Sequence, residues 1–239
     1  MPAARTARDR VRDEVTKEIL AVATAHLARD GAAALSLRSI ARDLEMAPSA
    51  LYRYFDGRDA LLSALILGAY TSLAEEAEKA ADAAERARES ESERWIAVPR
   101  TMRRWALARP HEWGLIFGSP VPGYRAPEET TVLYTRLAAA LVRPVADAQR
   151  NGRLHARRRG EESGEELSAA MDHALAPVHD VLLPDSTPTT VRHVLQSWAT
   201  LIGLISLELF GHFHNAMLDP GLLFEAAMRD AAADLGLGN

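Results

Sequence analysis

The residues from Ser36 to Phe55, SLRSIARDLEMAPSALYRYF, contain two short helical patterns with a break between them. From Leu37 to Leu44 apolar side chains recur at three- and four-residue spacing, as they do along one face of a helix. Pro48 suits the first position of a second helix. That helix spans about two turns, too short to be stable alone in water, so it must pack through Leu51 and Phe55.

A longer helix is expected before this pair, over Asp9–Asp30, because apolar residues recur at helical spacing there and Gly31 supplies a stop. Three helices in about 55 residues, with a tight turn between the second and third, form a helix-turn-helix arrangement, whose last helix enters the DNA major groove. The short helix exposes small, hydroxyl-bearing and basic groups that suit a close approach to DNA: Pro48, Ser49, Ala50, Tyr52, Arg53 and Tyr54.

The start of the chain carries a basic arm, in which Arg5, Arg8, Arg10 and Arg12 are opposed only by Asp9. Such an arm can approach phosphates, although a solvated and frayed terminus is the alternative. The whole chain has a net charge of −5. Residues 1–60 carry 10 Lys/Arg and 9 Asp/Glu, and the remainder carries 18 and 24, so the acidic excess lies outside the helix-turn-helix region.

The rest of the chain lacks strand patterns, and long Ala/Leu/Glu/Arg-rich segments predict an all-α fold. A long helix is expected over Arg58–Arg88, and Pro99 and Pro144 are expected to kink or divide their helices. The polar stretch from Arg157 to Glu166 is expected to be an exposed connection, or a basic patch through its arginines. The predicted organisation is a DNA-binding domain at residues 1–57 and a helical effector-binding and dimerisation domain at 58–239.

The composition excludes several classes of protein. The chain has 239 residues, 48% hydrophobic and 26% charged, which is typical of a globular protein. With no cysteine it has no disulfide, no cysteine-ligated zinc and no cysteine nucleophile. Charged residues interrupt every apolar run before it could span a membrane, and the N-terminus has no signal-peptide pattern. A cytoplasmic protein is therefore expected.

From Ile19 to Leu62 the sequence resembles the TetR family of bacterial transcriptional repressors. The resemblance is carried by the helix ending in Gly31, by SLRSIA from Ser36, by ALYRYF from Ala50 and by RDALL from Arg58. Two positions depart from the family pattern. Glu45 stands where glycine is usual, which is unfavourable if the backbone needs a positive φ. Ala47 stands where serine or threonine is usual, so a helix cap is lost.

The resemblance implies a role for each matching position. It implies that base edges are faced by Arg38, Pro48, Ser49, Ala50 and Arg53. It implies that phosphates are held by Ser36, Tyr52, Tyr54 and Arg58. The chemistry agrees, because arginine pairs bidentately with guanine and hydroxyls suit phosphate oxygens. The alternative for the two tyrosines is core packing, and Arg42 is expected to be a solvated surface residue.

The C-terminal part resembles the TetR group marked by a Trp-His-Gly signature, through Trp198 and Gly203, with Ile202 in the histidine position. The resemblance implies that two long helices, expected over Glu165–Leu183 and Pro188–Phe213, pair with their copies in a homodimer. The residues expected in that interface are Val194, Trp198, Leu201 and Ile205. A core within one chain is the alternative reading of these residues.

A TetR-like regulator holds a small-molecule effector among its central helices, where most of the aromatic residues of this chain lie. The expected pocket residues are Trp95, Met102, Trp105, Trp113, Phe117 and Tyr134, with Tyr124 nearby. Core packing is the alternative, since aromatics at helical spacing usually pack inside. A planar or lipid-like apolar effector is favoured slightly over an anion.

No other chemistry is indicated by the sequence. His212 and His214 point to different sides of a helix, and His173 and His179 are six residues apart, so neither pair predicts a metal site. No catalytic residue, metal or cofactor is expected, since nucleophile elbows, phosphate-binding glycine loops and HExxH motifs are absent. The predicted function is a ligand-responsive repressor that binds a double-stranded DNA operator. The alternative is a helical ligand-binding or catalytic protein whose N-terminal helices no longer bind DNA.

Overall fold

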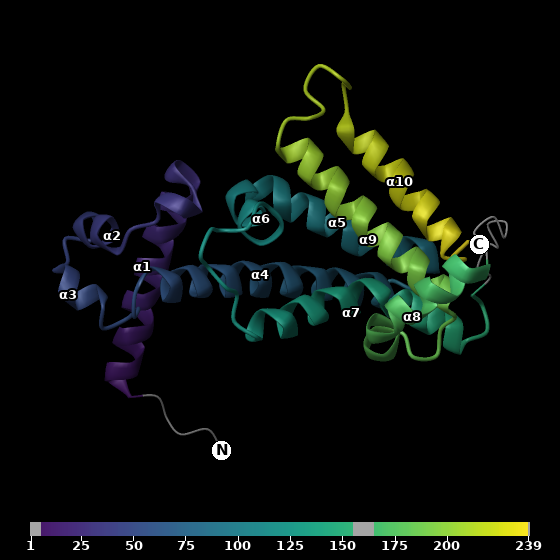
Figure 1. Ribbon diagram of the computed structural model, residues 1–239, viewed down its shortest axis with the longest axis horizontal. Helices are drawn as coiled ribbons and strands as arrows, with labels where there is room; N and C mark the ends of the chain where they lie inside the picture. Colours follow the sequence, from purple (N-terminus) through teal and green to yellow (C-terminus); the bar gives the residue numbers. More distant parts are fainter. Residues whose placement is uncertain (1–5, 155–164, 239) are drawn as a thin grey trace. The chain divides into compact units, whose positions relative to one another are not determined.

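The computed structural model describes residues 6–154 and 165–238, and within them the chain consists of helices and connections without any strand (Figure 1). The prediction of an all-α fold is confirmed. The elements are α1 (Ala7–Asp30), the 3₁₀ helix η1 (Ala32–Ala34), α2 (Leu37–Asp43), α3 (Pro48–Leu51), α4 (Arg58–Arg86), α5 (Glu91–Ala108), α6 (Pro110–Phe117), α7 (Glu129–Arg150), α8 (Glu165–Leu182), α9 (Pro188–Leu209) and α10 (Pro220–Asp234).

Contacts divide the chain into two compact units. The first contains residues up to Tyr70 together with His111–Thr131, and the second contains Thr71–Pro110 together with the residues from Val132 onward. Helix α4 therefore contributes its first turns to one unit and the remainder to the other. The division expected between residues 57 and 58 was drawn by function, and it stays a prediction.

The core of the first unit lies where α1, α2, α3 and the start of α4 meet. Ile19, Ile40, Leu51 and Leu61 are fully buried there, and burial of each such side chain contributes about 1.5–3 kcal/mol. Tyr124 packs at the edge of this core, where its hydroxyl lies 3.0 Å from Ser63 Oγ. Helix α3 is only four residues long, so this tertiary burial is what holds it in place.

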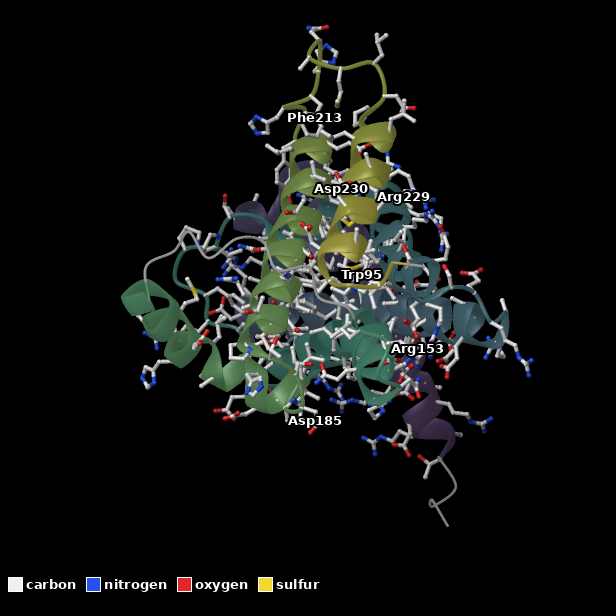
Figure 2. The ribbon with its side chains drawn as sticks, turned by 90° about the vertical axis from the view of Figure 1, so that its right-hand side faces the viewer. Trp95, Arg153, Asp185, Phe213, Arg229 and Asp230 are labelled. Atoms are coloured by element: carbon white, nitrogen blue, oxygen red, sulfur yellow. The ribbon has the colours of Figure 1, made fainter. Side chains whose placement is uncertain are left out.

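The second unit is a bundle in which α10 packs on α9 and α5, and α8 packs on α9. Figure 2 shows α9 and α10 lying side by side, with Arg229 and Asp230 on α10. Ion pairs join helices that are distant in sequence. Arg94 on α5 pairs with Asp147 on α7 at 2.6 Å, and Arg103 on α5 makes two bonds of 2.8 and 2.6 Å to Glu208 on α9.

The structure differs from several expected boundaries. Pro99 and Pro144 lie inside α5 and α7 and do not divide either helix. Helix α10 was not expected, although Asp219 caps its start by accepting a bond from the Gly221 N–H, and Pro220 occupies its first position. Arg5 of the basic arm lies outside the described residues. So does most of the polar connection expected over Arg157–Glu166, but Glu165 and Glu166 begin α8. Among the described helices, none combines the length and apolar character that a membrane span requires.

Candidate nucleic-acid interface

The turn between α2 and α3 is closed by backbone bonds. The Glu45 N–H donates to Arg42 O at 3.1 Å, and the Met46 N–H donates to Ala41 O at 2.8 Å. This geometry requires a φ of +52° at Glu45, a region in which side chains other than glycine are strained. Ala47 is the cap residue of α3 and provides no side-chain bond. Both departures from the family pattern therefore have structural consequences.

The short helix α3 separates buried from exposed side chains as its spacing predicts. Leu51 and Phe55 are buried in the core of the first unit. Pro48, Ser49 and Arg53 are exposed, and Tyr52 is 51% exposed. The exposed surface of α3 and of the turn after it thus presents the Ser49 hydroxyl, the Tyr52 phenol and the Arg53 guanidinium beside buried anchors.

The contributions from α2 lie beside this surface. Arg38 is exposed, one residue after the start of α2. Ser36 occupies the cap position of α2 without making a capping bond, and Ser36 and Ala50 are half-buried. Arg42 is exposed, donates to Ser39 Oγ at 3.3 Å and lies 3.7 Å from Asp43, which suits its expected surface role.

Tyr54 and Arg58 are held by the protein itself. Tyr54 is half-buried against the core, which supports core packing of its ring, whereas Tyr52 is exposed. The Arg58 guanidinium donates to Ala32 O at 2.9 Å and to Ala33 O at 3.4 Å, which ties the start of α4 to η1. A phosphate contact by Arg58 stays a prediction, and it would compete with these bonds.

A histidine–aspartate pair that was not expected joins α1 to α2. His26 is buried, and its Nε2 lies 2.7 Å from Asp43 Oδ2. This hydrogen bond lowers the pKa of Asp43 below its usual range. A sequence signal exists, because an aspartate at the C-terminal end of a helix is unfavourable for the helix dipole and therefore calls for another partner. The pair fixes the α2 end of the turn.

The basic arm is helical from Ala7 onward, so Arg8, Arg10 and Arg12 lie on α1 and are exposed. These three arginines and Arg53 provide the cationic groups that phosphates attract. No described residues form a group of three or more metal-ligating side chains.

The aromatic residues expected in an effector pocket fall into the two units. In the first unit, Trp113 is buried, with its ring centroid 4.4 Å from that of Phe117. In the second unit, Trp95 and Met102 are buried, and Trp105 Nε1–H donates to Ser72 Oγ on α4 at 3.0 Å.

Tyr134, also in the second unit, packs edge-on against Trp198 at 5.5 Å between ring centroids, and burial raises its pKa. The depth of Trp95, Met102 and Trp113 agrees with core packing. A cavity lined by the expected residues stays a prediction.

The expected dimer residues on α9 also lie inward. Leu201 and Ile205 are fully buried within the single chain, Val194 is nearly so, and Trp198 is half-buried. The outer face of α9 instead presents Ala199, Thr200 and Leu207, with the exposed Phe210 at its C-terminal cap. For Leu201 and Ile205 the intrachain core is therefore the reading that the burial supports.

Comparison with known proteins supplies the family context. A family described as "Bacterial regulatory proteins, tetR family" matches residues 19–65, and one described as "Tetracyclin repressor-like, C-terminal domain" matches residues 95–231. The HTH-type transcriptional regulators Mb1846 of Mycobacterium bovis and Rv1816 of Mycobacterium tuberculosis are each 35% identical over 220 residues, which is 91% of this chain and of each relative.

Solved structures agree with the sequence matches. The crystal structure of the regulatory protein SCO4313 is similar with a TM-score of 0.74 and 34% identity, covering 95% of this chain and 100% of that one. A protein of unknown function from Rhodococcus sp. RHA1 shares the fold, with a TM-score of 0.68, 22% identity and 99% coverage of each chain.

Proposed function

The chain belongs to the TetR family of bacterial transcriptional regulators and is a DNA-binding regulator, and we propose that it is a repressor released from a palindromic operator by a small-molecule effector. The observation that carries DNA reading is the surface of α3. Leu51 at its end and Phe55 in the turn beyond are buried and anchor it, while Ser49 on α3 and Tyr52 and Arg53 in the turn beyond are exposed. Arg38 and Arg53 would read bases, and Ser36 and Tyr52 would hold phosphates.

Selection of bound duplexes from random DNA tests this proposal directly. The expected product is a palindrome whose half-sites lie about one helical turn apart, because two short helices must read two neighbouring major grooves. Affinity should fall steeply with salt, since each neutralised phosphate releases counterions. Recovery of no enriched sequence, together with the absence of salt-dependent retention on DNA, would instead favour a helical protein that no longer binds DNA.

A palindromic operator requires a symmetric dimer. We propose that α8 and α9 form its interface through the side chains that remain exposed, namely Leu207 on α9, Phe210 at the C-terminal cap of α9, and Met171 and Val181 on α8. Ala199 and Thr200 lie on the same outer face of α9 and are small enough for close helix packing. Sedimentation at micromolar concentration should give a dimer. A monomer that still binds the palindrome would contradict the interface.

The effector is proposed to act on α4, whose residues belong to both compact units. In the second unit α4 is held by the Trp105 bond to Ser72 and by Arg136, which pairs with Glu78 at 2.7 Å. A planar apolar ligand that displaces Trp105 or Tyr134 would remove or shift these contacts. A tenfold loss of operator affinity requires that the ligand prefer the non-binding state by about 1.4 kcal/mol.

Trp105→Phe tests this coupling, because phenylalanine keeps an aromatic ring and removes the indole donor. We expect ligand-free operator affinity to change little and the response to planar apolar compounds to change. Tryptophan fluorescence quenching measures binding of those compounds, and operator retention measures the response. If no compound quenches and the variant responds like the wild type, these aromatics are core. The protein is proposed to act by binding, without catalysis, in the cytoplasm where bacterial DNA lies.

A further inference from the structure

Helix α1 begins well before it reaches the core. Its start is a capping box, in which Thr6 Oγ1 accepts from the Asp9 N–H at 3.2 Å and the Thr6 N–H donates to Asp9 Oδ2 at 3.1 Å. The first α1 side chain packed against the core is Val15. Residues 7–14 are therefore kept helical by the cap while they lie outside the core.

Arg12 lies on this early part of α1 and contacts the turn that follows the recognition helix. Its Nη2 donates to Arg53 O at 3.3 Å, across 41 residues of sequence. Its guanidinium carbon lies 5.7 Å from the centre of the Tyr54 ring, within the range of a cation–π contact. One side chain thus holds both a main-chain carbonyl and a ring in the turn that follows α3.

The turn after the recognition helix is also held by backbone bonds, in which the Tyr54 and Phe55 N–H groups donate to Leu51 O at 2.9 and 3.1 Å, and by the buried Phe55, whereas the helix itself has little local support. It is four residues long, and its cap residue Ala47 makes no side-chain bond. The buried Leu51 anchors its inner face, but the exposed Tyr52 and Arg53 lie on the turn beyond. The position of these two side chains therefore depends on what holds the turn.

We propose that Arg12 is a positioning residue for DNA reading, which holds the turn after α3 and so fixes the direction of Arg53. The inference rests on the proposed function, because its consequence is sequence preference. A basic residue of the arm has an obvious second role as a phosphate contact. The two roles differ in what they do to DNA of the wrong sequence.

Arg8 provides a matched control, because it is an exposed arginine on the same turns of α1, and its substitution removes the same charge. We expect Arg12→Ala to lower affinity about tenfold for the duplex that wild-type protein selects from a random library, with little loss on a scrambled duplex. Arg8→Ala should lower both affinities by a similar small factor. Arg12→Lys, which keeps a cation near Tyr54, should restore part of the preference.

A measurement without DNA tests the positioning role of Arg12 independently of the proposed function. Hydrogen exchange of the free protein should be faster at amides 50–55 in Arg12→Ala and unchanged in Arg8→Ala. Thr6→Ala, which removes the cap, should produce a weaker version of the same change.

Equal losses on both duplexes, with a salt slope reduced by about one contact, would make Arg12 a phosphate contact. Unchanged exchange at 50–55 would also overturn the positioning role. If the wild-type protein selects no duplex, the proposed function fails, and the exchange result still decides whether Arg12 holds the turn.

Discussion

The recognition segment, residues 36–58, and helix α9 show the same sequence signal with different outcomes. In both, apolar side chains recur at helical spacing. In the recognition segment the spacing separates buried Leu51 from exposed Tyr52. In α9 it identifies Leu201 and Ile205 as buried, but their cover comes from within the chain, where α5, α8 and α10 pack on α9. Spacing indicates which face is covered, and it does not indicate which helix covers it.

The largest expected effect is the loss of stability when a charge is placed on the buried face of α9, compared with a charge on its exposed face. Leu201→Glu should destabilise the second unit by about 4 kcal/mol or more, because it buries an unpaired charge. Leu207→Glu places the same charge on a side chain that is 40% exposed, so the chain should stay folded while the dimer weakens. Thermal melting and sedimentation measure the two effects. A folded, monomeric Leu201→Glu variant would return Leu201 to the interface.

A second effect tests the recognition segment. Arg53→Ala should lower operator affinity by about 1–3 kcal/mol and relax the preference at one base position, as loss of a bidentate base contact does. Arg42 lies in the same motif and donates to Ser39, so Arg42→Ala should change operator affinity little. Titration on operator and scrambled duplexes provides the measurement. Equal losses on both duplexes would show that Arg53 contacts phosphate.

The sequence predicts the helix-turn-helix part of the first unit because most contacts in that part are local, and it does not predict that residues 111–131 pack on the same core. The turn, the restart at Pro48 and the burial of Leu51 all follow from residues within one short motif. The ties that cross between helices were not predicted, including His26 with Asp43 and Arg12 with Arg53. Each joins side chains that only the tertiary packing brings together.

The second unit was less predictable because most of its ties join residues that are far apart in sequence. Its ion pairs span long stretches of sequence, with Arg103 and Glu208 separated by 105 residues. The start of helix α10 is marked in the sequence by Asp219 and Pro220, yet this helix was not among those expected, so the sequence left both a dimer interface and an intrachain core open for Leu201 and Ile205. The packing of α10 on α9 favours the intrachain core for these two residues.

A smaller effect concerns the turn of the recognition segment. Ala47→Ser should add a capping bond worth about 1 kcal/mol to the stability of the first unit. Glu45→Gly should relieve the strain of its positive φ by a similar or smaller amount, because glycine also loses more entropy on folding. Urea unfolding measures both. A destabilised Glu45→Gly variant would show that the turn is not strained.

The smallest effect is an acid dependence in the second unit, where the Arg100 guanidinium bonds to Glu93 and Glu225 and lowers the pKa of both carboxyls. A lowered pKa stabilises the fold above the ordinary value of about 4.5, and this stabilisation is lost as the pH falls through the lowered value. Because these side chains are about one-third exposed, solvent screening limits each contribution to about 1 kcal/mol or less.

Glu225→Gln should therefore be less stable than the wild type at pH 7, and the difference should shrink towards pH 3. Urea unfolding at both pH values measures the change, and Glu128→Gln, at an exposed glutamate, should show no such trend. The contact between Arg100 and Glu225 spans 125 residues and joins α5 to α10, so the titration reports on the packing that covers α9. If the difference in stability persisted at pH 3, Glu225 would stabilise this packing by its shape and not by its charge. The ion pair between Arg100 and Glu225 would then contribute nothing to the cover that α10 gives α9.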